Sequence, residues 1–200
     1  MLEEDLLLAL REETEIKNAS YDGVILPSAF CQNLEFQSVT FTRCRLSDGN
    51  FTKASFYDCK FVGCDLSNCK FSNSYWKNCL IDDCKCNGAA FPDSTFKGTS
   101  FTNASFVYAN LSESLLDGCE IVSTDLSKSF LSRLTLRRTK LRDCKLTNAE
   151  LFRTSLKGMD LSDCEISGIT LSDDLSELKG ATVSYTQGID LITMLGVKVK

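Results

Sequence analysis

The sequence predicts an all-β chain that winds into a coil and carries a short helix at each end. The main evidence is a period of five: from Ile16 to Leu171, every fifth residue is aliphatic, aromatic or cysteine, at 32 consecutive positions without an insertion. On an α-helix a step of five turns the side chain by about 140°, and along one straight strand an odd step alternates between the two faces. Neither element alone buries such a pattern, so each five-residue unit is predicted to be a short extended segment followed by a corner.

The other positions of the unit support this geometry. Two residues before each central residue, the side chain is small in 28 of 32 units. Side chains two apart in an extended segment point the same way, so one large and one small side chain both face inward. Two residues after the centre lies Gly, Asn or Asp in 21 of 32 units, and Pro27 and Pro92 directly follow a centre. This is the chemistry of a type II turn, whose third residue needs a positive φ.

Units such as Cys64 to Asn68, Ala109 to Glu113 and Thr124 to Lys128 read as a small residue, Asp or Asn, Leu, and then two polar residues. This pattern resembles the pentapeptide-repeat family over residues 14–173. The resemblance implies a right-handed quadrilateral β-helix with four units in each coil, and therefore about eight coils. With parallel strands spaced about 4.8 Å apart, the rod would be on the order of 38 Å long. The β-helix is expected to occupy residues 14–183.

Residues 1–13 are predicted to form a helix that caps the N-terminal end of the coil. Leu2, Leu6, Leu7 and Leu10 follow helical spacing, and acidic residues lie at the start of the segment, where the helix dipole favours them. Such a helix would cover strand edges and apolar side chains that the end of a solenoid otherwise exposes. A role in binding a partner is the alternative.

After Leu171 the five-residue register slips, and Leu178 and Val183 are expected to be two further centres. Residues 187–195 are predicted to form a helix that Gly196 ends. The alternation of residues 197–200 predicts a final strand. Residues 184–200 are therefore expected to form a terminal module, whose apolar residues include a candidate dimer contact of Ile189, Leu191, Ile192, Leu195, Val197 and Val199.

The segment from Leu178 to Val183, the helix with Leu191 and Ile192, and Leu195-Gly196-Val197 together resemble the C-terminus of the quinolone-resistance proteins of the Qnr and MfpA type. That resemblance implies an end-to-end, two-fold homodimer. It also implies binding to DNA gyrase or topoisomerase IV by a rod that mimics duplex DNA. Many Qnr proteins interrupt their coils with two projecting loops. This chain has none between residues 16 and 171, and in that respect is more similar to MfpA.

The chain has eleven cysteines and no histidine. Nine cysteines occupy the small inward position, and Cys31 and Cys86 are centres. Cys44, Cys64 and Cys84 would stack one coil apart, which raises the question of a metal site. A linear stack offers no tetrahedron, whereas a free cysteine packs like a small apolar residue. We therefore expect reduced, buried thiols and neither a metal nor a cofactor.

Charge and hydropathy restrict the classes of partner. Twenty-two basic residues against 27 acidic ones give a net charge of −5, which argues against direct nucleic-acid binding through a basic patch. No apolar run approaches the roughly 18 residues of a membrane span. The acidic N-terminus differs from the basic start of a secretory signal. A cytoplasmic protein is expected.

Two surface features are candidate contact sites. When successive units are assigned in turn to the four sides of the coil, one face gathers the acids Asp22, Asp82, Asp83, Glu120, Asp143, Asp160 and Asp163. This face is the candidate footprint for a topoisomerase, and an ordinary solvated face is the alternative. Phe130 and Phe152 fall on outward positions of another face in adjacent coils, beside Arg133 and Arg153. Exposed aromatic residues with arginine are enriched at contact sites, although scattered apolar surface residues are also normal.

Catalysis is not expected, because a filled core and short corners leave no pocket in which to position reacting groups. Two functions therefore remain. One is a topoisomerase-binding, quinolone-resistance-type dimer. The other is a pentapeptide-repeat scaffold or interaction protein with a different protein partner.

Overall fold

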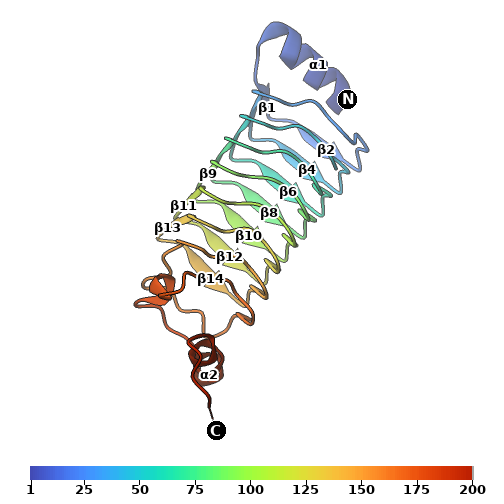
Figure 1. Cartoon of the computed structure of the whole chain (residues 1–200). Helices are drawn as coiled ribbons and strands as arrows, with labels where there is room; N and C mark the ends of the chain where they lie inside the picture. The colour runs from blue at the N-terminus through green and yellow to red at the C-terminus, as the bar shows by residue number, and fades with distance from the viewer. Residues whose placement is uncertain (200) are drawn as a thin grey trace.

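The computed structural model describes residues 1–199 of the 200-residue chain. The chain winds into a rod with a helix at each end (Figure 1). Two parallel seven-stranded sheets run along the rod, and each strand pairs with its equivalent in the next coil, as Phe36 does with Phe56. One sheet contains β1 (Ile16–Lys17), β3 (Glu35–Gln37), β5 (Ser55–Tyr57), β7 (Tyr75–Lys77), β9 (Thr95–Lys97), β11 (Leu115–Asp117) and β13 (Thr135–Arg137). The other contains β2 (Ser20–Asp22), β4 (Thr40–Thr42), β6 (Lys60–Val62), β8 (Leu80–Asp82), β10 (Ser100–Thr102), β12 (Glu120–Val122) and β14 (Lys140–Arg142).

The rod has two further sides, each built from single-residue bridges in place of strands. One series, the Ile25 side, starts with the pair Ile25–Arg45 and ends at Glu165. The other, the Phe30 side, starts with the pair Phe30–Asn50 and ends at Thr170. We name the remaining two sides by their sheets, the β1–β13 side and the β2–β14 side. Four sides in every coil confirm the predicted quadrilateral solenoid. Seven coils carry a strand in both sheets, and an eighth is joined by bridges alone.

The core is aromatic in the N-terminal half of the rod and aliphatic in the C-terminal half. Phe56 stacks on Phe36 and on Trp76, with ring centroids 5.0 and 4.0 Å apart, because the parallel register places each centre over the equivalent centre of the preceding coil. Such aromatic pairs contribute about 0.5–1.5 kcal/mol each beyond their buried area. From Leu111 onward the centres are leucine or isoleucine, and a void of about 20 Å³ lies among them.

The corners adopt the predicted backbone geometry. The residue two after the centre has a positive φ in 30 of the 32 units, including poor candidates such as Lys53 (φ 58°) and Tyr108 (φ 60°). Lys53 accepts this conformation because its N–H donates to the carbonyl of Ser72 in the next coil at 2.9 Å. The ladder between coils therefore overrides the local preference of the residue.

Helix α1 (Leu2–Glu12) lies on the N-terminal end of the rod as predicted. Leu2, Leu6 and Ala9 are buried against the first coil. The Tyr21 hydroxyl donates to the Asp5 carboxylate at 2.7 Å and fixes the helix to that coil. Leu7, which follows the same helical spacing, lies on the outer face of the helix and is 63% exposed.

The C-terminal end is closed by two polar side chains. Within the 3₁₀ turn Ser176–Leu178, the buried Glu177 carboxylate accepts from the backbone N–H of Arg153 at 2.7 Å. The Gln187 amide donates to the carbonyls of Leu161 and Cys164 at 2.9 and 2.6 Å. Both side chains thus satisfy backbone groups that a further coil would otherwise pair.

Helix α2 (Tyr185–Met194) begins two residues before the predicted start at residue 187 and ends one residue before the predicted end at residue 195. Ser184 caps it and exchanges hydrogen bonds with Gln187. Leu178 and Val183 pack half-buried against the core, as expected for further centres. The predicted final strand is wrong over residues 197–199, which are irregular and exposed. A strand needs a neighbour with which to pair, and α2 carries the chain away from the last coil (Figure 1). Lys200 lies outside the described residues.

Candidate interaction surfaces

The acidic residues predicted to share one face do lie on the β2–β14 side, but they form three separate groups along it. Asp22 ends β2, whereas Asp82 and Asp83 lie at the end of β8. Three coils, about 14 Å at ladder spacing, separate these two groups. That distance exceeds the Debye length of about 8 Å at physiological ionic strength. The remaining acids, Glu120, Asp143, Asp160 and Asp163, lie toward the α2 end of the rod. The face is therefore three acidic groups and not one continuous strip.

Neighbouring side chains bind several of these carboxylates. The Arg43 guanidinium pairs with Asp22 at 2.5 Å. Asp82 accepts from the Thr102 hydroxyl at 2.6 Å and from the Asn103 amide at 3.2 Å. Within residues 1–199, the structure shows no ion pair for the acids of the α2-end group. Lys140 lies directly beside Glu120 in the β12–β14 register and Arg142 lies on the same strand, so these two cations offset part of the charge of the group.

Within the α2-end group, side-chain hydrogen bonds hold three of the carboxylates, and the Cys164 thiol donates to Asp163 at 3.3 Å. The Ser123 hydroxyl donates to Asp143 at 2.9 Å. The Ser162 hydroxyl donates to Asp160 at 2.6 Å. That hydrogen bond, with a second from the Ser162 backbone N–H, lowers the pKa of Asp160. The Asp160 carboxylate is therefore ionised at neutral pH.

Phe130 and Phe152 are exposed on the Phe30 side in adjacent coils, as predicted, with exposed fractions of 44% and 37%. The Arg153 guanidinium lies 5.0 Å from the centre of the Phe152 ring. Arg133 pairs with Glu113 at 2.9 Å. Arg153 is thus held beside the aromatic pair and gives this small patch a mixed apolar and cationic character, whereas Arg133 is bound by Glu113. Its role as a contact site stays a prediction.

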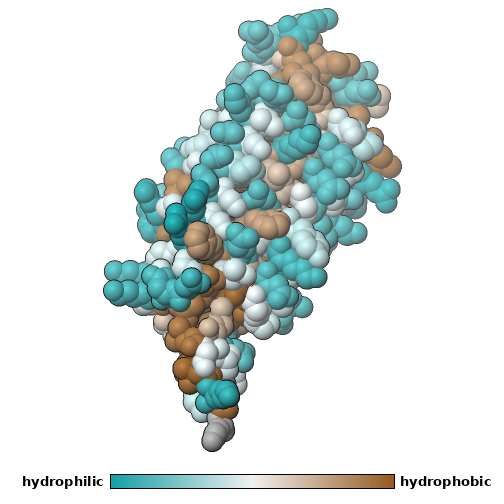
Figure 2. Space-filling view, in the orientation of Figure 1, coloured by the Kyte–Doolittle hydropathy of each residue, from teal (hydrophilic) through white to brown (hydrophobic). Residues whose placement is uncertain are grey.

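The residues proposed for a dimer contact separate into two sets. Ile192 and Leu195 are 43% and 59% exposed, and Val197 and Val199 are exposed beyond them. Ile189 is half-buried. Leu191 packs half-buried against the solenoid core and so attaches α2 to the rod. Figure 2 shows hydrophobic surface gathered at this C-terminal end of the molecule.

All eleven cysteines are buried free thiols. In the small inward position, a thiol donates to a carbonyl of the preceding coil, as Cys69 Sγ does to Leu46 O at 3.0 Å. Burial raises the pKa of the Cys69 thiol to about 12, so it is neutral and unreactive at physiological pH. In the part of the chain that the structure describes, no cluster of three or more Cys, Asp or Glu side chains is arranged to hold a metal ion.

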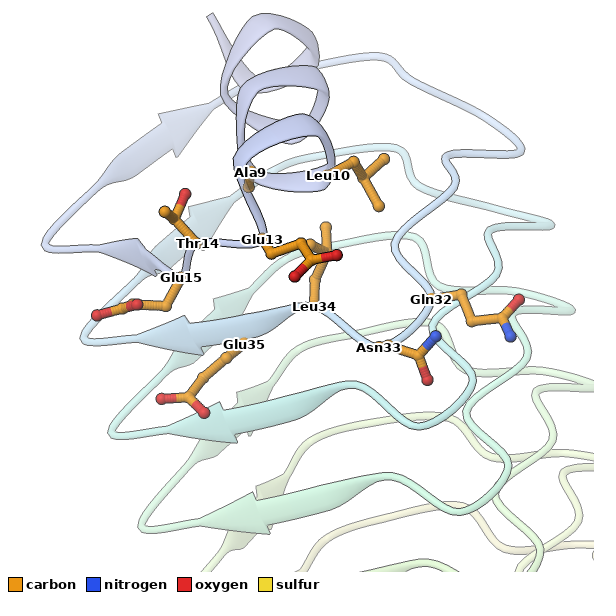
Figure 3. A pocket seen from close by; sticks show the side chains of 9 residues that line it. All are labelled: Ala9, Leu10, Glu13, Thr14, Glu15, Gln32, Asn33, Leu34 and Glu35. Atoms are coloured by element: carbon orange, nitrogen blue, oxygen red, sulfur yellow. The ribbon is translucent and has the colours of Figure 1, made fainter.

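A cavity of about 530 Å³ lies between the end of α1 and the edge of the next coil (Figure 3). Glu13 extends over Leu34, and Gln32 and Asn33 lie on the opposite side. The lining is completed by Ala9, Leu10, Thr14, Glu15 and Glu35. These side chains offer an apolar floor and an acidic rim. They include no cysteine, lysine or histidine.

The geometry above matches what sequence comparison finds. A family described as "Pentapeptide repeat region" matches residues 69–143. A second, "Pentapeptide repeats (8 copies)", matches residues 35–73 and 131–173. Together they span most of the solenoid. The chain belongs to the pentapeptide-repeat family.

Several solved pentapeptide-repeat structures are similar to this chain. Trypsin-treated QnrB1, described as a plasmid-mediated fluoroquinolone resistance protein, is 17% identical, with 94% of this chain and all of that chain covered and a TM-score of 0.48. A pentapeptide repeat protein from the thylakoid lumen of Arabidopsis thaliana is 24% identical, with 68% and 90% covered and a TM-score of 0.43. HetL from Nostoc sp. strain PCC 7120 is 14% identical, with 88% and 94% covered and a TM-score of 0.28. No curated protein matches the sequence.

Some features of this pentapeptide-repeat chain escaped the sequence-based prediction. Ile25, Phe30 and Tyr108 are exposed apolar or aromatic residues that were not singled out. Reading the position just before each centre would have found Ile25 and Phe30, because a large apolar residue there points outward. Tyr185, at the exposed start of α2, was likewise missed. No helix within residues 1–199 has the length and apolar character that crossing a membrane requires.

Proposed function

We propose that this pentapeptide-repeat protein is a non-catalytic binder of DNA gyrase or topoisomerase IV that pairs end to end through α2 and reduces quinolone poisoning. The observation that carries the proposal is the terminal module. Its sequence resembles that of quinolone-resistance proteins, and its helix leaves Ile192 and Leu195 exposed at the end of the rod. An isologous contact between two copies is the commonest way to cover such a patch.

Binding without catalysis suits the construction of the rod. Its inward positions are filled by apolar side chains, thiols and small hydroxyl-bearing side chains, and its sides are built from short strands and tight corners. Histidine, the commonest general base, does not occur in the sequence. The chain therefore offers long outer sides for recognition. In this proposal the protein acts in the cytoplasm, where its partner enzymes work and where thiols stay reduced.

The α2-end acids are the proposed enzyme-facing surface. A two-fold contact at the C-termini would place Asp143, Asp160 and Asp163 of both copies on either side of the dimer axis. At about 4.8 Å per coil, two rods of eight coils would span on the order of 80 Å. An enzyme groove that holds DNA phosphates is basic, so a paired acidic surface of this kind is complementary to it. Since the net charge is modest, the binding is expected to weaken with salt.

A supercoiling and DNA-cleavage assay with ciprofloxacin tests the proposal. Wild type at tenfold molar excess over gyrase should reduce drug-dependent cleavage, and the Asp143→Lys, Asp160→Lys, Asp163→Lys variant should not. The matched control reverses Asp65, Asp125 and Glu165 on the Ile25 side, with the same change in charge, and should behave as wild type. No effect of the wild type rejects topoisomerase binding. An effect that survives the first triple reversal rejects this surface.

The alternative function is a scaffold that binds another protein, and the Phe130 and Phe152 patch favours it. This patch lies on the Phe30 side, across the rod from the β2–β14 side. Binding of a partner at this patch should be lost in a Phe130→Ser, Phe152→Ser variant, which should retain its effect on gyrase. If wild type has no effect on gyrase while binding to another protein depends on these two residues, the alternative replaces the topoisomerase proposal.

A further inference from the structure

We infer that the β1–β13 side carries a second docking surface, which takes an acidic segment of a partner protein in an extended conformation. The surface, here named the basic stripe, consists of Lys77, Lys97, Arg137 and Lys157. All four side chains are exposed, and they occupy equivalent positions of successive coils in one outer row that only Asp117 interrupts. The inference does not depend on the topoisomerase proposal.

Charge is divided along this side of the rod. From β7 to residue 158, the outward positions carry five cations, which are the basic stripe and Arg138, against the single acid Asp117. Arg138 donates to Asp117 at 2.7 and 2.9 Å, so that acid is already neutralised. The first three rungs carry Glu15, Glu35 and Asp58 against Lys17. The side is therefore cationic toward α2 and anionic toward α1.

Stability does not explain this arrangement. Lys77 lies directly beside Lys97 in the β7–β9 register, and like charges opposite each other on neighbouring strands destabilise a sheet. The ammonium of Lys97 lies 5.6 Å from the centre of the Tyr75 ring, and its other sheet neighbour, Asp117, is already bound by Arg138. A local rule that is broken with so little compensation within the chain is typical of a functional surface.

The Ile25 side of the same molecule provides an internal comparison. Its bridged column reads Arg45, Asp65, Lys85, Ser105, Asp125, Lys145 and Glu165, so every charged neighbour has the opposite sign. Burial favours the neutral form of Asp65, but hydrogen bonds from Ser67 and the charges of Lys85 and Arg45 outweigh it and lower the pKa of Asp65. The repeat can thus alternate charge where stability decides, and on the β1–β13 side it does not.

The length and borders of the basic stripe indicate the partner. Four coils separate Lys77 from Lys157, about 19 Å, which matches an extended peptide of roughly six residues. Beyond Lys77 the side turns acidic at Asp58, and the whole chain has a net charge of −5. A long polyanion such as a nucleic acid would run onto those acids, whereas a short acidic peptide ends before them. Tyr75 and Leu115, half-buried beside the stripe, add apolar contact area.

The test is fluorescence anisotropy of a fluorescein-labelled hexaglutamate peptide with the full chain in about 50 mM salt. The Lys97→Glu, Arg137→Glu variant should bind at least tenfold more weakly than wild type. So should Lys77→Glu, Lys157→Glu, which leaves both sheet neighbours of Asp117 in place. The matched control is Lys85→Glu, Lys145→Glu on the Ile25 side, which changes net charge equally and should lose less than threefold. Circular dichroism verifies that each variant is folded.

Three outcomes would overturn the inference. The first is no binding of hexaglutamate by wild type at 1 mM protein. The second is an equal loss in the stripe variants and in the control, which would reduce the effect to net charge. The third is binding of a fluorescein-labelled oligo-dT at least tenfold tighter than hexaglutamate and lost in the same variants, which would assign the stripe to nucleic acid.

Discussion

Removing one buried hydroxyl should destabilise this protein more than its size suggests, because a hydrogen-bonded chain in the core depends on it. Trp76 is the only tryptophan and is fully buried. Its Nε1–H donates to Ser74 Oγ at 2.8 Å, Ser74 Oγ lies 3.0 Å from Ser94 Oγ, and Ser94 Oγ donates to Phe71 O at 2.8 Å. Since the Ser94 hydroxyl donates its only proton to the Phe71 carbonyl, the Ser74 hydroxyl donates to Ser94 and accepts from the indole.

The Ser74→Ala variant leaves the indole N–H unpaired between stacked rings. An unsatisfied buried donor costs about 1–3 kcal/mol. We therefore expect the free energy of unfolding to fall by about 2 kcal/mol. Ser129→Ala is the matched control, because Ser129 is equally buried and its Oγ donates only to Leu126 O. That carbonyl still accepts the Ser129 N–H in the variant, so the expected loss is about 0.5–1 kcal/mol.

The assay is urea denaturation followed by circular dichroism, with Trp76 fluorescence as a second probe of the core. A double-mutant cycle with Trp76→Phe isolates the indole contribution, and a coupling of about 1–2 kcal/mol with Ser74→Ala is expected. If Ser74→Ala is no more destabilising than Ser129→Ala, or if the coupling vanishes, the argument from the unpaired indole is refuted.

Four other predictions follow from the ends, the corners and the core of the rod. Ile192→Asp with Leu195→Asp should convert a dimer into a monomer by light scattering, and a wild type already monomeric at micromolar concentration contradicts the contact. Hydrogen bonds from Ser172 and from the backbone outweigh the burial of Glu177 and hold its pKa below the ordinary value. The ionised Glu177 therefore contributes its full share to the free energy of unfolding above the normal glutamate pKa, and this share is lost as pH falls through the lower pKa of the folded state. The difference in free energy of unfolding between wild type and Glu177→Gln should then narrow from pH 6 to pH 3, and a constant difference contradicts this. Lys53→Gly should raise the free energy of unfolding by about 0.5–1 kcal/mol, because glycine tolerates the positive φ, and a loss of stability would show that the lysine side chain contributes there. Alkylation followed by mass spectrometry should modify all eleven thiols only after denaturation, and a protected pair would indicate a disulfide.

The sequence predicts the solenoid well because the five-residue period of apolar residues follows the period with which the coil buries its side chains. Each centre from Phe36 to Phe106 is buried because the backbone path repeats once per coil, and no long-range information is needed. The ends lack such a period. The roles of Glu177 and Gln187 depend on which backbone groups the last coil leaves unpaired, and only the folded chain shows this. The alternation at residues 197–199 predicts a strand, but no neighbour is in reach to pair with it.

The candidate surfaces divide in the same way. Assigning residues to sides by their position within the coil places the acids and the two phenylalanines correctly. It does not reveal how far apart the acids lie along the rod, or that Arg43 and Ser123 bind two of their carboxylates. The like-charged neighbours Lys77 and Lys97 on the β1–β13 side were not singled out from the sequence, although the sequence pattern contains them. Reading each outward column along the rod, and not summing charge over a whole side, separates its cationic and anionic halves.

The change from aromatic to aliphatic centres along the rod has a consequence for how the molecule comes apart. In a solenoid each coil contacts only its neighbours, so stability is a sum of local terms and can fail from one end. Leucine centres lack the ring stacking of the first half and enclose a small void. Fraying should therefore start beside α2 and advance toward Trp76, so amide hydrogen exchange should be fastest beside α2 and slow progressively toward Trp76. A second copy bound at α2 would clamp the weaker end, so that self-association would also protect the protein against unfolding.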